Sequence, residues 1–77
     1  MKDVPEDYAS AKKWFRLAAD QGFAPAQSYL GVMYGNGQGV PEDYAKAVQW
    51  LRLAADQGEA IAQFFLDAMY AKGKGIP

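Results

Sequence analysis

The sequence of 77 residues repeats itself with a period of 36 residues. The segment 4–22, VPEDYASAKKWFRLAADQG, returns at 40–58 as VPEDYAKAVQWLRLAADQG, and residues 76–77 begin a third copy. More than half of the positions in the first copy carry the same residue 36 positions later. Self-similarity at a fixed period of roughly 20 to 50 residues is typical of repeat proteins, in which each unit packs mainly on its neighbours. The chain is therefore expected to be a short array of structural repeats.

The repeated segment has the pattern of an amphipathic helix with its own start and stop signals. Its apolar residues recur at the spacing of one helical face: Tyr44, Ala47, Val48, Leu51, Ala54 and Ala55. Asp43 precedes them as a candidate N-cap, and Gly58 follows them as a C-terminal stop. Because a left-handed residue commonly ends a helix, we expect positive φ at Gly58 and at its counterpart Gly22.

Four helices are expected, at residues 7–21, 25–35, 43–57 and 60–71. The first and third come from the repeated segment and are called B helices; the second and fourth are called A helices. One side of the first A helix carries nearly only small residues, so we expect neighbours to pack on more than one of its sides. Short connections favour antiparallel neighbours. The pattern predicts an all-α solenoid of antiparallel helix pairs in B-A-B-A order.

The repeat also predicts the domain organisation. The whole chain, 1–77, is expected to be a single repeat domain. It divides into a half repeat at 1–22 with one B helix, a full repeat at 23–58 with an A and a B helix, and a half repeat at 59–77 with one A helix. Glycine-rich connections follow both A helices, at 35–39 and 73–75.

The details resemble the Sel-one-like repeat family, a branch of the tetratricopeptide-like α-solenoids. The residues that carry the resemblance are Ala26-Gln27, Leu30-Gly31, Tyr34, Gly37-Gln38-Gly39-Val40, Asp43, Ala47-Val48-Gln49-Trp50, Ala54-Ala55 and Gly58. The last helix departs from it, since Asp67 stands in the place of Gly31 and Ala71 in the place of Gly35. The cysteine pairs of the secreted members are also missing. The resemblance implies a right-handed α-solenoid that is a scaffold for protein contacts and not an enzyme.

The composition leaves little for catalysis. The chain has no His, Cys or Thr, and its only serines are Ser10 and Ser28. A catalytic triad or a nitrogen–sulfur metal site therefore cannot be assembled within one chain, and no cofactor is expected. The carboxylates at 6–7 and 42–43 recur at helix starts, where capping accounts for them, although an acid–base pair is the alternative. The glycine loop 35–39 invites comparison with a phosphate-binding loop, but it lacks a preceding strand and a following Lys-Ser/Thr pair.

Charge and hydropathy argue against two further classes. The net charge of −1 provides no general attraction to nucleic acid or to anionic lipid, and the lysines are offset by nearby acids. No apolar run is long enough to span a bilayer, and residues 1–6 do not form a signal peptide. A soluble chain is expected. Its compartment stays open, because a chain without cysteine carries no redox signature.

Residues that differ between the copies are the candidates for partner contacts, since recurring residues build the solenoid. On the small-residue side of the A helices these are Ser28, Val32 and Asn36 in one copy and Phe64, Asp67 and Ala68 in the other. Phe64 is a large apolar residue where its counterpart is a serine; a core position is the alternative. The recurring residues are expected to be core: Trp14, Leu30, Met33, Trp50, Leu51, Leu66 and Met69.

These observations predict a protein–protein interaction module. The alternative is an accessory domain that binds a small molecule or a peptidoglycan fragment in the same groove. An enclosed pocket with convergent polar groups would favour the alternative, and an open, partly apolar groove the module.

Self-association is also expected, because the first and last helices keep apolar residues without a neighbouring helix to cover them. These residues are Trp14, Phe15, Phe65, Met69 and Tyr70. A second copy would continue the solenoid head to tail as a ring or filament, or exchange helices in a two-fold dimer. The alternative is a monomeric piece of a longer array. Asp67 weakens the expectation, since a charge is unwelcome in an apolar contact.

Overall fold

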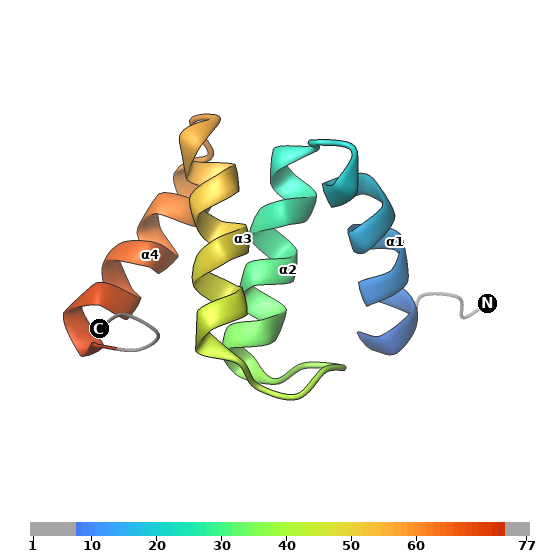
Figure 1. The fold of residues 1–77 in the computed structure, drawn as a ribbon, viewed down its shortest axis with the longest axis horizontal. Helices are drawn as coiled ribbons and strands as arrows, with labels where there is room; N and C mark the ends of the chain where they lie inside the picture. The colour runs from blue at the N-terminus through green and yellow to red at the C-terminus, as the bar shows by residue number, and fades with distance from the viewer. Residues whose placement is uncertain (1–7, 74–77) are drawn as a thin grey trace.

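The computed structural model describes residues 8–73, which form four antiparallel α-helices (Figure 1). The helices are α1 (Tyr8–Asp20), α2 (Ala24–Asn36), α3 (Tyr44–Asp56) and α4 (Ala60–Lys72). No strand occurs in this part of the chain. Every observed helix end lies within one residue of its expected position, which confirms the all-α fold and the B-A-B-A order. Predictions for 1–7 and 74–77 lie outside the described residues.

Local signals end the helices where the sequence indicated. The Asp43 carboxylate caps α3 by accepting a hydrogen bond from the backbone N–H of Lys46 at 3.0 Å. Gly22 and Gly58 follow α1 and α3 with φ of 90° and 89°. These values confirm the prediction of positive φ at both positions. This region of φ favours glycine, which has no Cβ to clash with the backbone.

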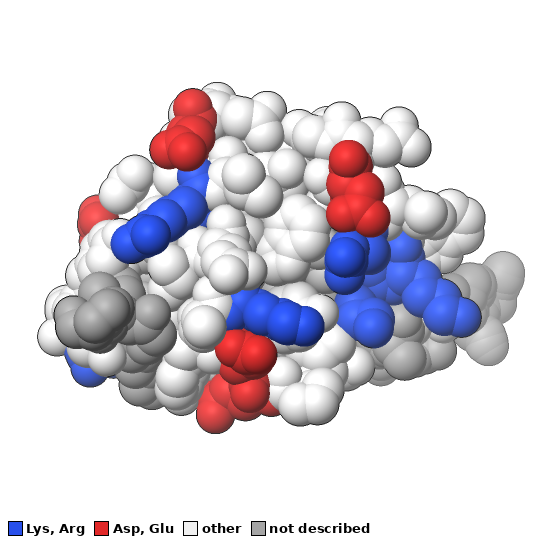
Figure 2. Space-filling model, in the orientation of Figure 1, with Lys and Arg blue, Asp and Glu red and all other residues white. Residues whose placement is uncertain are grey.

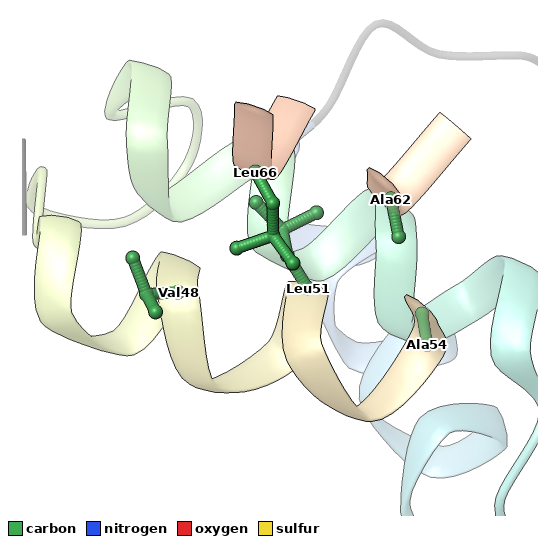
Figure 3. Packing of buried hydrophobic residues seen from close by; sticks show 5 residues of the cluster. All are labelled: Val48, Leu51, Ala54, Ala62 and Leu66. Carbon is green, nitrogen blue, oxygen red and sulfur yellow. The ribbon is translucent and has the colours of Figure 1, made fainter. Parts of the chain in front are cut away.

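The core consists of two clusters that share equivalent repeat positions, such as Ala26 with Ala62 and Leu30 with Leu66. One lies between α1 and α2 and contains Ala19, Ala26, Leu30 and Met33. The other lies between α3 and α4 and contains Val48, Leu51, Ala54, Ala62 and Leu66, with Leu51 and Leu66 side by side (Figure 3). The predicted burial of Leu30, Met33, Leu51 and Leu66 is confirmed. Trp50 and Met69 are only half-buried at the edges of the clusters.

Helix α2 contacts α1 on one side and α3 on the other, and α3 approaches it closely at Gly31. An added Cβ at Gly31 would lie 2.5 Å from Cγ of Leu51 and 3.1 Å from the backbone oxygen of Ala47. The Gln27 side chain of α2 forms hydrogen bonds to α1 and to the C-cap of α3. Its amide donates to the Ala19 carbonyl at 3.1 Å, and its oxygen accepts from the Gln57 amide at 3.0 Å. Both observations confirm the expectation of neighbours on more than one side of this helix.

The prediction that Trp14 is buried is wrong, because this side chain is 72% exposed. Its counterpart Trp50 packs on the α1–α2 cluster, which precedes it in the array. No described helix precedes α1, so Trp14 lacks the surface on which Trp50 packs. Tyr70 is likewise 43% exposed, whereas its counterpart Tyr34 is buried.

Candidate functional site

A groove with a volume of about 350 Å³ runs between α2 and α4. Val32, Gly35 and Asn36 of α2 line one side, and Leu51 and Tyr44 of α3 line its base. The α4 side is larger and consists of Phe64, Phe65, Ala68, Met69 and Lys72. Most of this lining is apolar. The groove is therefore a surface on which an apolar segment can lie.

The repeat explains why these side chains share one groove. Val32 and Ala68 are 36 residues apart, and so are Asn36 and Lys72. Since α2 and α4 are equivalent helices packed against the same α3, equivalent positions face the same side. The side chains that differ between the repeats therefore determine which apolar and polar groups line the groove.

Four of the six residues predicted to contact a partner line this groove: Val32, Asn36, Phe64 and Ala68. Phe64 is 67% exposed, and its ring meets that of Phe65 edge to face, with centroids 5.4 Å apart. Asp67 is exposed but does not line the groove.

Ser28 requires a correction, because it is 2% exposed and cannot face a partner. It lies one turn after Ala24, which packs against the α3–α4 cluster, so the neighbouring helices cover this side of α2. Among the described residues its hydroxyl has no hydrogen-bond partner. A pattern on α2 alone did not reveal this burial, because other helices cause it.

The residues predicted for self-association fall into different environments. Trp14 is exposed on α1, while the Phe15 ring stacks on Tyr29 at a centroid distance of 5.1 Å. Phe65 and Met69 line the groove. The Tyr70 hydroxyl accepts a hydrogen bond from Arg52 Nη2 at 2.7 Å. Two of the five residues thus lie on the first helix and three on the last, and their role in self-association stays a prediction.

Sequence reasoning missed Lys72 as a groove residue. The signal was present, since Lys72 occupies the repeat position of the predicted contact Asn36. Lys72 is the one charged residue in the lining, and it forms no salt bridge within residues 8–73. The groove thus combines an apolar wall with a single cation at one end.

The groove offers binding surface rather than reactive groups. No carboxylate, His or Cys is among its lining residues. Within the described residues, no group of three or more His, Cys, Asp or Glu side chains is placed to hold a metal ion. None of the described helices is both long and apolar enough to cross a membrane. Figure 2 shows acidic and basic side chains on the face in view, with several basic side chains gathered on the side of α1.

Antiparallel helices in two equivalent pairs, with the A helices lining one groove, define an α-solenoid of the tetratricopeptide-like class. The family model described as Sel1 repeat matches residues 2–23 and 24–59. The chain belongs to the Sel1 repeat family. Repeats of this family typically bind proteins, and their fold is typically non-catalytic.

Solved structures agree with this assignment. The crystal structure of a Sel1 repeat protein from Oxalobacter formigenes shares 37% sequence identity over 95% of this chain, with a TM-score of 0.88. The crystal structure of c5321, a protective antigen of uropathogenic Escherichia coli with an SLR fold, shares 47% identity over 97% of this chain, with a TM-score of 0.90. The present chain spans 30% and 16% of the lengths of those two proteins. Among curated proteins, no sequence matches the chain.

Proposed function

We propose that this chain is a protein-interaction module that binds a segment of another protein in the groove between α2 and α4. The observation that carries the proposal is an open, mainly apolar groove bounded by two A helices, with Phe64 exposed at its rim. An exposed aromatic side chain beside an apolar groove is a typical anchor for a protein partner.

The charges indicate the chemistry of the bound segment. Lys72 is the sole charged lining residue, and the amide of Asn36 stands at the equivalent position of the other wall. A segment with an apolar side chain against Phe64 and Phe65, and with a carboxylate near Lys72, satisfies both features. Charge complementarity of this kind contributes mainly specificity and association rate.

The alternative, binding of a small molecule or a peptidoglycan fragment, fits the groove less well. Sugar recognition needs several convergent polar groups, because each buried hydroxyl that loses its water must be hydrogen-bonded again. Asn36, Tyr44 and Lys72 are the polar residues in the lining. The remaining lining residues are apolar or glycine, which favours a protein segment.

Selection from a displayed peptide library on the immobilised chain tests the proposal. The selected peptides are expected to combine an apolar residue with an acidic one, and their affinity is then measured by fluorescence anisotropy. Phe64→Ala and Lys72→Glu are expected to weaken binding about tenfold or more, which corresponds to roughly 1.4 kcal/mol.

Leu53→Ala is the matched control, since Leu53 is exposed on α3 but does not line the groove. This variant is expected to bind like the unmodified chain. Peptides that bind equally well to the Phe64 and Lys72 variants would place the site elsewhere. Specific binding of muropeptides, lost in the same two variants, would support the alternative function.

A further inference from the structure

The α2–α3 interface is a template for the contact that a second copy would make in continuing the solenoid. With a period of 36 residues, α4 is the counterpart of α2, and α1 is the counterpart of α3. If α1 of a second copy docked on α4 in the repeat register, each pair of contacting residues would correspond to an observed pair between α3 and α2. The two sets can be compared position by position.

One part of the template is fully preserved. Trp50 packs on the cluster of Ala19, Ala26, Leu30 and Met33. The counterparts of these four cluster residues in the second repeat are identical: Ala55, Ala62, Leu66 and Met69. Helix α4 and the end of α3 thus offer Trp14 of a second copy the same surface that Trp50 uses. By this criterion alone, head-to-tail association is favoured.

A second part of the template is lost at the closest approach of the helices. Gly31 allows α3 to come so near that an added Cβ would lie 2.5 Å from Leu51 Cγ and 3.1 Å from the Ala47 backbone oxygen. Asp67 holds the position of Gly31, and Phe15 holds that of Leu51. In that register the Cβ of Asp67 would meet the Phe15 side chain and the Ala11 backbone, which cannot move aside cheaply, so it is expected to force the helices apart. Burying its carboxylate against Phe15 adds a desolvation cost.

The Asp67 carboxylate also has a hydrogen-bond partner on its own helix. The Gln63 amide donates a hydrogen bond to the Asp67 carboxylate at 3.0 Å. The counterpart of Gln63 is Gln27, which bonds to Ala19 of α1 and to Gln57 just after α3. The residue that joins helices in the first repeat therefore supports an exposed carboxylate in the second.

A third difference acts in the same direction. Ser28 is 2% exposed beneath neighbouring helices, whereas its counterpart Phe64 is 67% exposed. The space that holds a serine in the template does not hold a phenylalanine without displacing its neighbours. Ala71, in contrast, is no obstacle. An added Cβ at its counterpart Gly35 would lie 3.7 Å from the Ala47 Cβ, which is an ordinary contact.

We propose that Asp67, together with Phe64, prevents a second copy from docking on α4. The side of α4 concerned is the one equivalent to the side of α2 that contacts α3, so the chain does not continue the solenoid head to tail. This inference replaces the expected association of the two end helices, and it does not depend on what the groove binds. The physical cause is the lost close approach at Asp67 rather than a missing apolar surface, because the acceptor for Trp14 is intact.

The mass of the chain in solution tests this role, measured by light scattering over a wide range of protein concentrations. The unmodified chain is expected to stay monomeric. The variant with Asp67→Gly and Phe64→Ser restores both template residues and is expected to associate at least about tenfold more tightly. Adding Trp14→Ala to that variant should return it to a monomer, since it removes the residue that docks.

Asp67→Ala separates the two causes. It removes the charge but keeps the Cβ, so it is expected to remain monomeric. Circular dichroism of each variant confirms that its helices are formed, and the single Asp67→Gly variant carries the test if the double variant is unfolded. Association of the unmodified chain that Trp14→Ala abolishes would overturn the proposal. A folded double variant that stays monomeric, or an Asp67→Ala variant that associates as tightly as Asp67→Gly, would also overturn it.

Discussion

Trp14 and Trp50 hold the same position in successive repeats but lie in different environments. Trp50 packs on the core cluster between α1 and α2, and the Arg16 guanidinium lies 5.4 Å from its ring centroid. Trp14 is 72% exposed, because no described helix covers the corresponding side of α1. In a solenoid, the repeat position sets the direction of a side chain, and the neighbouring repeat sets its burial.

This difference predicts unequal effects of the same substitution. Trp50→Ala is expected to lower the free energy of unfolding by about 1.5–3 kcal/mol, less than the roughly 3–5 kcal/mol for a core Trp, because Trp50 is half-buried. Trp14→Ala is expected to change it by no more than about 0.5 kcal/mol, as at other exposed positions. Urea denaturation followed by circular dichroism measures both. Equal losses would show that Trp14 is packed in solution.

Two glycines of α2 form a second matched pair. Gly31→Ala is expected to lower stability by about 1–3 kcal/mol, because the new Cβ would overlap Leu51. Gly35→Ala meets only an ordinary contact with Ala47, so it is expected to be neutral or to stabilise the helix by up to about 1 kcal/mol. Thermal unfolding of the two variants decides between them. A neutral Gly31→Ala variant would mean that α2 and α3 are not in close contact at this point.

Leu30 is completely buried in the α1–α2 cluster. Leu30→Ala is expected to lower the free energy of unfolding by about 2–5 kcal/mol, through lost burial and the cavity left behind. Since a domain is stabilised by only about 0.05–0.15 kcal/mol per residue, this loss is expected to unfold much of the protein. The helical circular dichroism signal at room temperature reports it. The exposed Leu53 provides the control, because Leu53→Ala should leave that signal unchanged.

Ser28 offers the opposite expectation. Its buried hydroxyl has no hydrogen-bond partner among the described residues, and an unsatisfied buried polar group costs about 1–3 kcal/mol. Ser28→Ala removes that group with little change in volume, so stability is expected to stay the same or to rise within this range. Ser28→Val, which adds volume at a closely packed site, is expected to destabilise. A clear loss of stability in the alanine variant would indicate that the hydroxyl is hydrogen-bonded.

The helices, their ends and their equivalence follow from local patterns along the chain. The 36-residue period, the Asp43 cap and the terminating Gly22 and Gly58 are local signals, and each specified the structure found at its own position. Periodicity also brought Val32 and Ala68 onto the same groove, because equivalent positions of equivalent helices face the same side.

Which of these positions are covered, and which side chains line the groove, depends instead on how the helices pack against one another. Trp14 and Ser28 have the patterns of a core and a surface residue, yet the first is exposed and the second buried. Burial depends on helices distant in sequence, and two copies of one motif receive different neighbours at the two ends of an array. The significance of Asp67 likewise followed from the distance between Gly31 and Leu51, since a sequence shows that a glycine was replaced but not how closely another helix approaches it.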